Sequence, residues 1–314
     1  MLEKTLTEML CIRPSGQVRW NVGGRSRWAD LTNSVAVAFA FSAVCLAQQI
    51  SDIPQWQIAA GGTRTFEVAS VKRATEPKAP NFPLTPDNSY PVTGGRLSGA
   101  LQLTVYIQFA YKLRLTPVQV ERMIAHLPRW VGDESFEIEA KGDPNATKDQ
   151  IRLMMQSLLA KRFGLQVHFE NHEEPVLELE LVKAGKPGSG IQVHPANGSC
   201  DSPEAFPALC SAFQVRLRKD GTRDLGGRNV TMPDLAEVLP IVDRTLGQVV
   251  VDRTGLRGHF DVLVNWMPES DPPIEPVGPT FRQALNDQLG MKLRSGRDSV
   301  RTLVIDHVVR PDEN

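Results

Sequence analysis

Two stretches of the chain, one near the middle and one near the end, have the same order of polar and apolar positions. In each, an amphipathic helix pattern stops at a glycine, Gly164 in the first copy and Gly290 in the second. Glycine readily takes the left-handed conformation in which helices end. Each glycine is followed at the same distance by an apolar run. Each copy therefore predicts a helix, a glycine stop and a hairpin, whose strands in the first copy are 165–169 and 175–182.

Three helix starts are predicted from the spacing of threonine with glutamine or aspartate. A threonine three positions before such a residue forms a capping box, in which side chains satisfy free N–H groups of the first turn. The three capping pairs are Thr147 with Gln150, Thr231 with Asp234, and Thr280 with Gln283.

A further helix is predicted over 101–111, where apolar residues recur at helical intervals.

Strand patterns alternate between apolar and acidic residues. In 135–140 the apolar Phe136 and Ile138 alternate with Glu137 and Glu139, which predicts a half-buried strand. Acid pairs of this kind, including Glu178 with Glu180, are typical of the outward face of a sheet rather than of a general acid and base. Other predicted strands cover 66–72, 212–218, 249–252 and 259–264, and a long Pro-rich loop covers 73–93.

A Gly-Gly-Arg sequence precedes the first helix of each half, at 94–96 and at 226–228. Phosphate-binding loops are also rich in glycine, but these two lack the full glycine pattern and the lysine of such loops. Turn formation explains both sequences better.

These recurring features predict an α+β fold of two repeated small modules. Each module has a mixed or antiparallel sheet with helices on one face. The predicted organisation is a signal peptide over 1–47, a spacer over 48–62, a first module over 63–185, a bridge with two cysteines over 186–225, and a second module over 226–314.

The first 47 residues are typical of a secretory leader. A basic flank precedes the apolar run 31–47, which ends in Cys45-Leu-Ala47 and predicts cleavage after Ala47. The alternative is an uncleaved membrane anchor, so a membrane contact is expected only if the leader is retained. The protein is therefore expected to be periplasmic or extracellular.

The overall composition is that of an ordinary globular protein, with 41% hydrophobic and 23% charged residues. The formal net charge of -1 and the lack of a basic stripe argue against nucleic-acid binding.

Export also changes the interpretation of the cysteines. Cys200 and Cys210 are the only pair after the leader, and in an oxidising compartment they are expected to form a disulfide. A metal site is the weaker alternative, because no second cysteine pair or nearby histidine completes a tetrahedral ligand set.

No constellation in the sequence predicts a catalytic, cofactor or metal site. His168 and His172 are closely spaced, but they follow the glycine stop, where a solvated hairpin tip is favoured over a metal site. Trp130 and Trp266 are candidates for lining a groove between the modules, with core packing as the alternative.

Several segments resemble an uncharacterised, soil-associated family of secreted proteins abundant in Acidobacteria. The resemblance covers about residues 64–312 and implies export and the duplicated architecture, but no activity. One departure is the start of the first helix, where 100–102 lacks the family's threonine cap. The matching segments are 66–72, 108–111, 136–140, 158–163, 251–258 and 304–308.

Together these patterns predict an exported, non-catalytic binding or adaptor protein whose partner is an unknown envelope or extracellular protein. Sheet edges or a groove between the modules are its expected contact surfaces. The alternatives are a secreted hydrolase whose site forms only in three dimensions, and a purely structural envelope protein.

Overall fold

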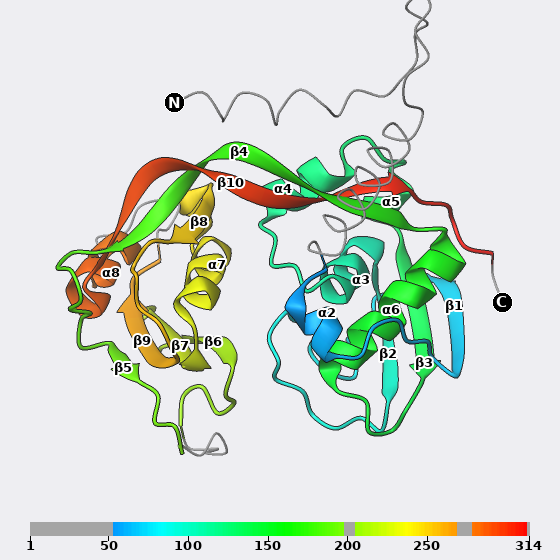
Figure 1. Ribbon diagram of the computed structural model, residues 1–314, viewed down its shortest axis with the longest axis horizontal. Helices are drawn as coiled ribbons and strands as arrows, with labels where there is room; N and C mark the ends of the chain where they lie inside the picture. Colours follow the sequence, from blue (N-terminus) through cyan, green and yellow to red (C-terminus); the bar gives the residue numbers. More distant parts are fainter. Residues whose placement is uncertain (1–52, 198–204, 269–277, 313–314) are drawn as a thin grey trace, which may run out of the picture. The chain divides into compact units, whose positions relative to one another are not determined.

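The computed structural model describes residues 53–197, 205–268 and 278–312 (Figure 1). The predicted leader lies outside the described residues, and so do residues 48–52 of the predicted spacer. All the elements described below lie in one compact unit, Pro54–Asn314. The fold is α+β, as predicted, with helices packed on several small sheets.

The first sheet contains three antiparallel strands in the order β1-β3-β2. Its central strand confirms the predicted alternation, because Phe136 and Ile138 are buried and the glutamate that follows each of them is not. The strands are β1 (Val68–Ala74), β2 (Arg96–Gln102) and β3 (Ser135–Lys141).

Strand β2 was not predicted, although the turn before it was. Gly94 and Gly95 have positive φ angles of 63° and 72°, as a turn requires. A Cβ on Gly95 would lie 2.3 Å from the carbonyl oxygen of Asp143, so a larger residue would also clash with the backbone there. The chain then runs as a strand up to Gln102, and the predicted helix begins one residue later.

The helices of the first half cover one large hydrophobic cluster. The helix predicted over 101–111 is confirmed as α3, and the capped, glycine-stopped helix is confirmed as α6. The predicted spacer contains one short helix, α2. The helices are α2 (Gln55–Ala59), α3 (Leu103–Ala110), α4 (Pro117–Ile124), α5 (Trp130–Asp133) and α6 (Lys148–Phe163).

The second sheet has four antiparallel strands in the order β5-β9-β7-β6. The order β5-β9-β7 matches that of β1-β3-β2 in the first sheet. Strand β6 is a fourth strand at the edge of this sheet, next to β7. The sequence patterns do not predict β5. The strands are β5 (Ile191–Val193), β6 (Ala212–Leu217), β7 (Arg223–Val230) and β9 (Phe260–Trp266).

The turn predicted at 226–228 is wrong, because these residues lie inside strand β7. Gly226 and Gly227 have no side chains, and aromatic rings occupy the space. A Cβ on Gly226 would lie 2.7 Å from the ring of Phe206, and a Cβ on Gly227 would lie 2.5 Å from the ring of Phe213. The glycines therefore permit close packing over the sheet rather than a change of direction.

A second hydrophobic cluster lies between this sheet and its helices. All three predicted capping boxes are present, and the helices before the two repeated glycines end at them in the left-handed conformation, with φ of 56° at Gly164 and 64° at Gly290. The remaining helical segments are α7 (Met232–Val242), the short 3-10 turn η1 (Arg244–Leu246) and α8 (Phe281–Leu289).

The two glycine-stopped helices each lead into a long strand, and these two strands pair with each other (Figure 1). Strand β4 (Gln166–Leu181) is antiparallel to β10 (Met291–His307), and the short β8 (Val249–Asp252) joins β4 in parallel. We call the β4–β10 pair the ribbon. Its residues contribute to both hydrophobic clusters.

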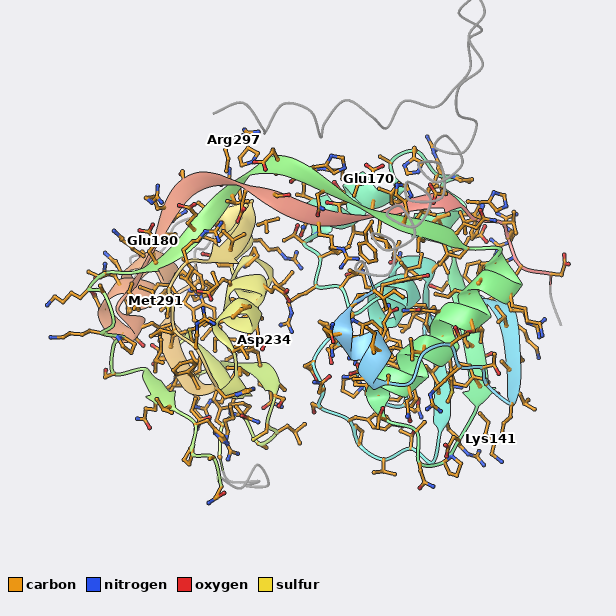
Figure 2. The ribbon with its side chains drawn as sticks, viewed as in Figure 1. Lys141, Glu170, Glu180, Asp234, Met291 and Arg297 are labelled. Atoms are coloured by element: carbon orange, nitrogen blue, oxygen red, sulfur yellow. The ribbon has the colours of Figure 1, made fainter. Side chains whose placement is uncertain are left out.

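The hairpin predicted after each glycine is therefore wrong. Residues 170–174 contain no glycine, which tight two-residue hairpin turns favour. Instead, each long strand pairs with the other, and this pairing satisfies the backbone N–H and C=O groups over almost the full length of both strands. Figure 2 shows Glu170 and Arg297 on the ribbon, with Glu180 and Met291 toward its end near α8.

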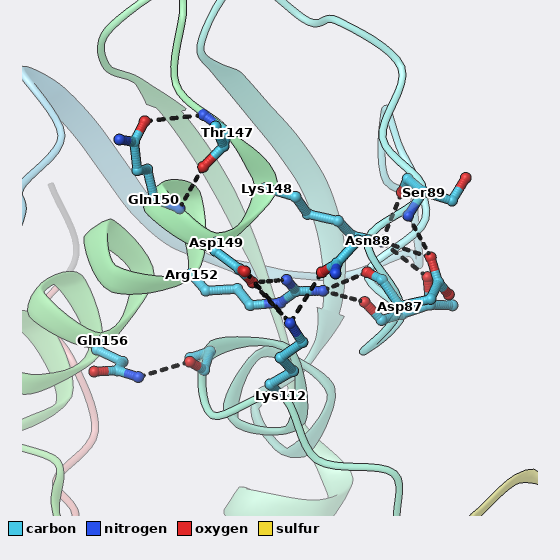
Figure 3. Close-up of polar contacts among 12 residues, drawn as sticks. Asp87, Asn88, Ser89, Lys112, Thr147, Lys148, Asp149, Gln150, Arg152 and Gln156 are labelled. Atoms are coloured by element: carbon cyan, nitrogen blue, oxygen red, sulfur yellow. Dashed lines mark hydrogen bonds and ion pairs between the residues drawn. The ribbon is translucent and has the colours of Figure 1, made fainter. Parts of the chain in front are cut away.

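A buried polar network fixes the long loop predicted over 73–93 (Figure 3). The ammonium group of Lys148, with a side chain only 2% exposed, donates to Thr85 Oγ1, Asp87 Oδ1 and the Ser89 carbonyl. The guanidinium of Arg152 donates to the carbonyl oxygens of Thr85 and Asp87. Burial lowers the pKa of Lys148 to about 8, against the opposing effect of Asp87. The loop is thus held by two cations of α6.

Candidate ligand-binding site on the second sheet

The two tryptophans proposed for a groove belong to different hydrophobic clusters. Trp130 packs against the first cluster, with its ring 5.9 Å from that of Phe136 in an edge-to-face arrangement. Trp266 is a buried member of the second cluster, with its ring 5.1 Å from that of Phe281. Both side chains have the core-packing role that the sequence left as the alternative.

The two closely spaced histidines lie on the outer face of the ribbon. His168 contacts Glu170 at 2.8 Å and Asp306 at 2.9 Å, and His172 contacts Glu170 at 2.9 Å. The Glu170 carboxylate and then the Asp306 carboxylate accept hydrogen bonds from the ring, which raises the pKa of His168. Within the described ranges, no group of three or more histidine, cysteine and acidic side chains has the arrangement of a metal site.

The alternating acid pairs form ion pairs across the sheets. Glu137 and Glu139 both contact Lys78, and Glu178 and Glu180 both contact Arg294. These contacts give the acid pairs a role in charge pairing. The predicted outward position is wrong for Glu178, which is buried and paired with arginines.

The predicted disulfide between Cys200 and Cys210 stays a prediction. Cys210 lies in the described part of the chain, but Cys200 lies outside it.

A histidine–aspartate pair occurs next to the second sheet, where a hydrolase could use one. Nδ1 of His194 is 2.7 Å from Oδ1 of Asp261, which also accepts a hydrogen bond from the Asn229 backbone. Over the described residues, no hydrogen bond connects the His194 ring to a serine, threonine or cysteine. The pair therefore ties the chain after β5 to β9.

The most organised polar group is built around Asp224, whose side chain is fully buried. Its oxygen Oδ2 accepts from Arg216 at 2.6 and 3.1 Å, and both oxygens accept from Nε of Arg218 at 2.9 Å. Asn265 donates to Oδ1 at 2.8 Å. Burial by itself raises the pKa of Asp224, but the hydrogen bonds from these three side chains outweigh it and hold the pKa below its usual value.

Strand geometry explains this grouping. Arg216 lies opposite Asp224 in the β6–β7 pairing, and Arg218 follows two residues later on the same face. Both arginine side chains are about half exposed, at 49% and 47%. The Arg216 guanidinium also stacks 4.2 Å from the centre of the Phe206 ring. The buried carboxylate and the ring thus hold two guanidinium groups at the protein surface.

This arrangement leaves binding capacity unused. Asp224 is the carboxylate that accepts from both guanidinium groups, and Asp220 of the same hairpin adds a weaker attraction to Arg218. A guanidinium has five N–H donors, of which Arg218 uses only Nε in the contacts above. We call Arg216, Arg218 and Asp224 the arginine site. Its remaining donors suit a planar anion such as a carboxylate.

The arginine site opens onto a pocket of about 510 Å³. The pocket lies on the face of the sheet opposite the second cluster, because Asp224 and Asn265 alternate with the buried Leu225 and Val264. Its volume is within the usual range for small-ligand sites. Its lining includes Arg218, Asp224, Arg228, Asn265, Gln288 and Phe206.

The sequence contains a signal for this site that matches no known motif. Arg216 and Arg218 stand two residues apart in a predicted strand, so they share a face. Their buried partner, Asp224, could be recognised only after β6 and β7 were paired.

Comparison with known proteins gives a family for the chain. The model of a family described as a protein of unknown function (DUF3738) matches residues 104–308. The chain belongs to the DUF3738 family. The DUF3738 match begins in α3 and ends just after β10, so it includes the arginine site and the ribbon. No curated protein and no solved structure matches the chain.

None of the helices built from the described residues has both the length and the apolar character needed to cross a membrane.

Proposed function

We propose that this DUF3738 protein is an exported, non-catalytic binding or adaptor protein, periplasmic or extracellular, whose arginine site binds an acidic group of its partner. The observation that carries the proposal is the fully buried Asp224 carboxylate holding two half-exposed guanidinium groups. The apolar leader pattern and the resemblance to the soil-associated secreted family support export. The partner is an envelope or extracellular protein with exposed aspartate or glutamate side chains.

The buried position of Asp224 has an energetic cost. A buried carboxylate is costly unless it is paired and hydrogen-bonded, and its partners here extend to the surface. A role in stability alone needs only one cation. The second guanidinium is already fixed in orientation beside a pocket. Less conformational entropy of the protein is therefore lost when an anion binds to it.

A labelled hexaglutamate peptide is the probe for this proposal. We expect saturable binding to the full purified chain by fluorescence anisotropy, and much weaker binding of hexaglutamine. Replacing Arg218 by lysine keeps a positive charge next to Asp224 but removes the planar fork of donors. We expect R218K to weaken hexaglutamate binding about tenfold, the loss of roughly one charge-assisted hydrogen bond.

Arg257→Gln is the matched control, because Arg257 is an exposed arginine outside the site. It should leave affinity within about twofold of wild type, since single exposed charges contribute little. If R257Q and R218K weaken binding equally, the attraction is general electrostatics and the arginine site is not the binding site. Capture of the partner from an envelope and secretome extract, compared between wild type and R218K, then identifies the physiological ligand.

A further inference from the structure

The second half contains another pocket, of about 610 Å³, on the opposite side of the sheet from the arginine site. It lies where the end of α7 and the turn η1 meet the start of α8. Its apolar wall includes Trp266 and Phe281, whose rings pack edge to face at 5.1 Å and are almost fully buried. Their burial gives the pocket a fixed apolar floor.

Two apolar side chains that line the pocket remain exposed to solvent. Val215 is 48% exposed and Ile241 is 36% exposed, and Met267 also contributes to the lining. An apolar group that enters the pocket would contact these side chains and remove their surface from water. Such burial contributes about 25 cal/mol for each Å² of apolar surface.

The polar part of the pocket is positively charged. Arg223 and Arg244 line it and are exposed, and their side chains make no hydrogen bond or ion pair with other described residues. The carboxylate of Asp243, which also lines the pocket, accepts from the backbone and hydroxyl of Thr245 through Oδ1. The lining thus has two cations and one anion, and that anion already accepts two hydrogen bonds.

We propose that this pocket binds a small amphiphilic acid, with its carboxylate at Arg223 and Arg244 and its apolar part against Val215 and Ile241, above the floor that the buried Trp266 and Phe281 form. A neutral apolar ligand would leave the guanidinium groups without a partner. A short acid such as acetate would leave the side chains of Val215 and Ile241 exposed. The pocket volume is ample for an acid with a chain of several carbons.

Calorimetry on the full purified chain tests this with three probes: octanoate, octan-1-ol and acetate. We expect saturable octanoate binding and at least tenfold weaker binding of each of the other two. The double variant Arg223→Gln, Arg244→Gln should weaken octanoate binding at least tenfold. Arg257→Gln should leave it within twofold.

A second variant removes the space and keeps the charges. Ile241→Trp places a large ring at the exposed wall, and we expect it to abolish octanoate binding while circular dichroism shows a folded protein. The proposal is overturned if octanoate does not bind saturably, if octan-1-ol binds equally well, or if the arginine double variant binds octanoate as wild type does. The arginine site is unchanged in these variants, so hexaglutamate binding should persist.

Discussion

Glu173 of β4 lies directly opposite Ser299 of β10, and both stand nine residues after the glycine that ends the preceding helix. Corresponding positions of the two sequence copies therefore meet at the middle of the ribbon. An antiparallel pair centred in this way is self-complementary. A position before the centre in one copy lies opposite the position equally far after the centre in the other copy, and the reverse also holds. The similarity between the two segments thus becomes a direct contact between them.

The two glycine stops should differ in their tolerance of alanine. Both have left-handed φ angles, so alanine costs roughly 1–2 kcal/mol at either position. A Cβ on Gly290 would lie 2.7 Å from the backbone nitrogen of Gly188, whereas a Cβ on Gly164 meets only side-chain atoms at 3.2 Å or more. We expect G290A to lower the free energy of unfolding clearly more than G164A in urea titrations. Equal losses would show that the Gly188 contact relaxes freely.

Removing the buried guanidinium of α6 should be strongly destabilising. Arg152→Ala leaves the carbonyl oxygens of Thr85 and Asp87 without their donor, and we expect a loss of about 3 kcal/mol. Arg122→Ala removes an exposed ion pair with Glu174 and should cost less than about 1 kcal/mol. Urea unfolding of both variants provides the comparison. Similar losses would contradict an anchoring role for Arg152.

Stability should rise with pH above about 8. The folded-state pKa of Lys148 is about 8, below the usual 10.5, so between these values the unfolded chain binds more protons. The free energy of unfolding then increases with pH. We expect this increase between pH 8 and 9.5 in urea titrations, and a smaller one in Lys148→Met. A wild-type stability that stays flat over this range would contradict burial of the charged amine.

Asp224 should contribute to stability at neutral pH and lose that contribution in acid. Its pKa is below the usual value in the folded protein, so the contribution is complete above about pH 4 and is lost as pH falls through the lower, folded-state pKa. Asp224→Asn should cost roughly 3 kcal/mol at pH 7, because two guanidinium groups lose their counter-charge. Asp220→Asn, at an exposed residue of the same hairpin, is the control for urea unfolding at pH 7 and pH 3. Equal effects of the two substitutions would count against the role of Asp224.

Local interactions explain what the sequence by itself determined. A capping box needs only Thr147 and Gln150 three residues apart, and a helix stop needs only a glycine such as Gly164, so both could be predicted without knowing the fold. The strand over 135–141 follows in the same way from the alternation of Phe136 and Ile138 with glutamates. The interactions behind these features involve only residues that are close together in the sequence.

Tertiary structure decided which strands pair and which polar side chains meet. The segment after Gly164 has the same composition whether it folds back as a hairpin or pairs with β10, and only contacts with a strand more than a hundred residues away select the ribbon. Gly226 and Gly227 likewise suit a turn or a crowded strand, and the rings packed over them decide. The arginine site depends on the pairing of β6 with β7, which places Asp224 under two arginines. Such long-range pairings depend on the packing of the whole chain, which no local pattern encodes.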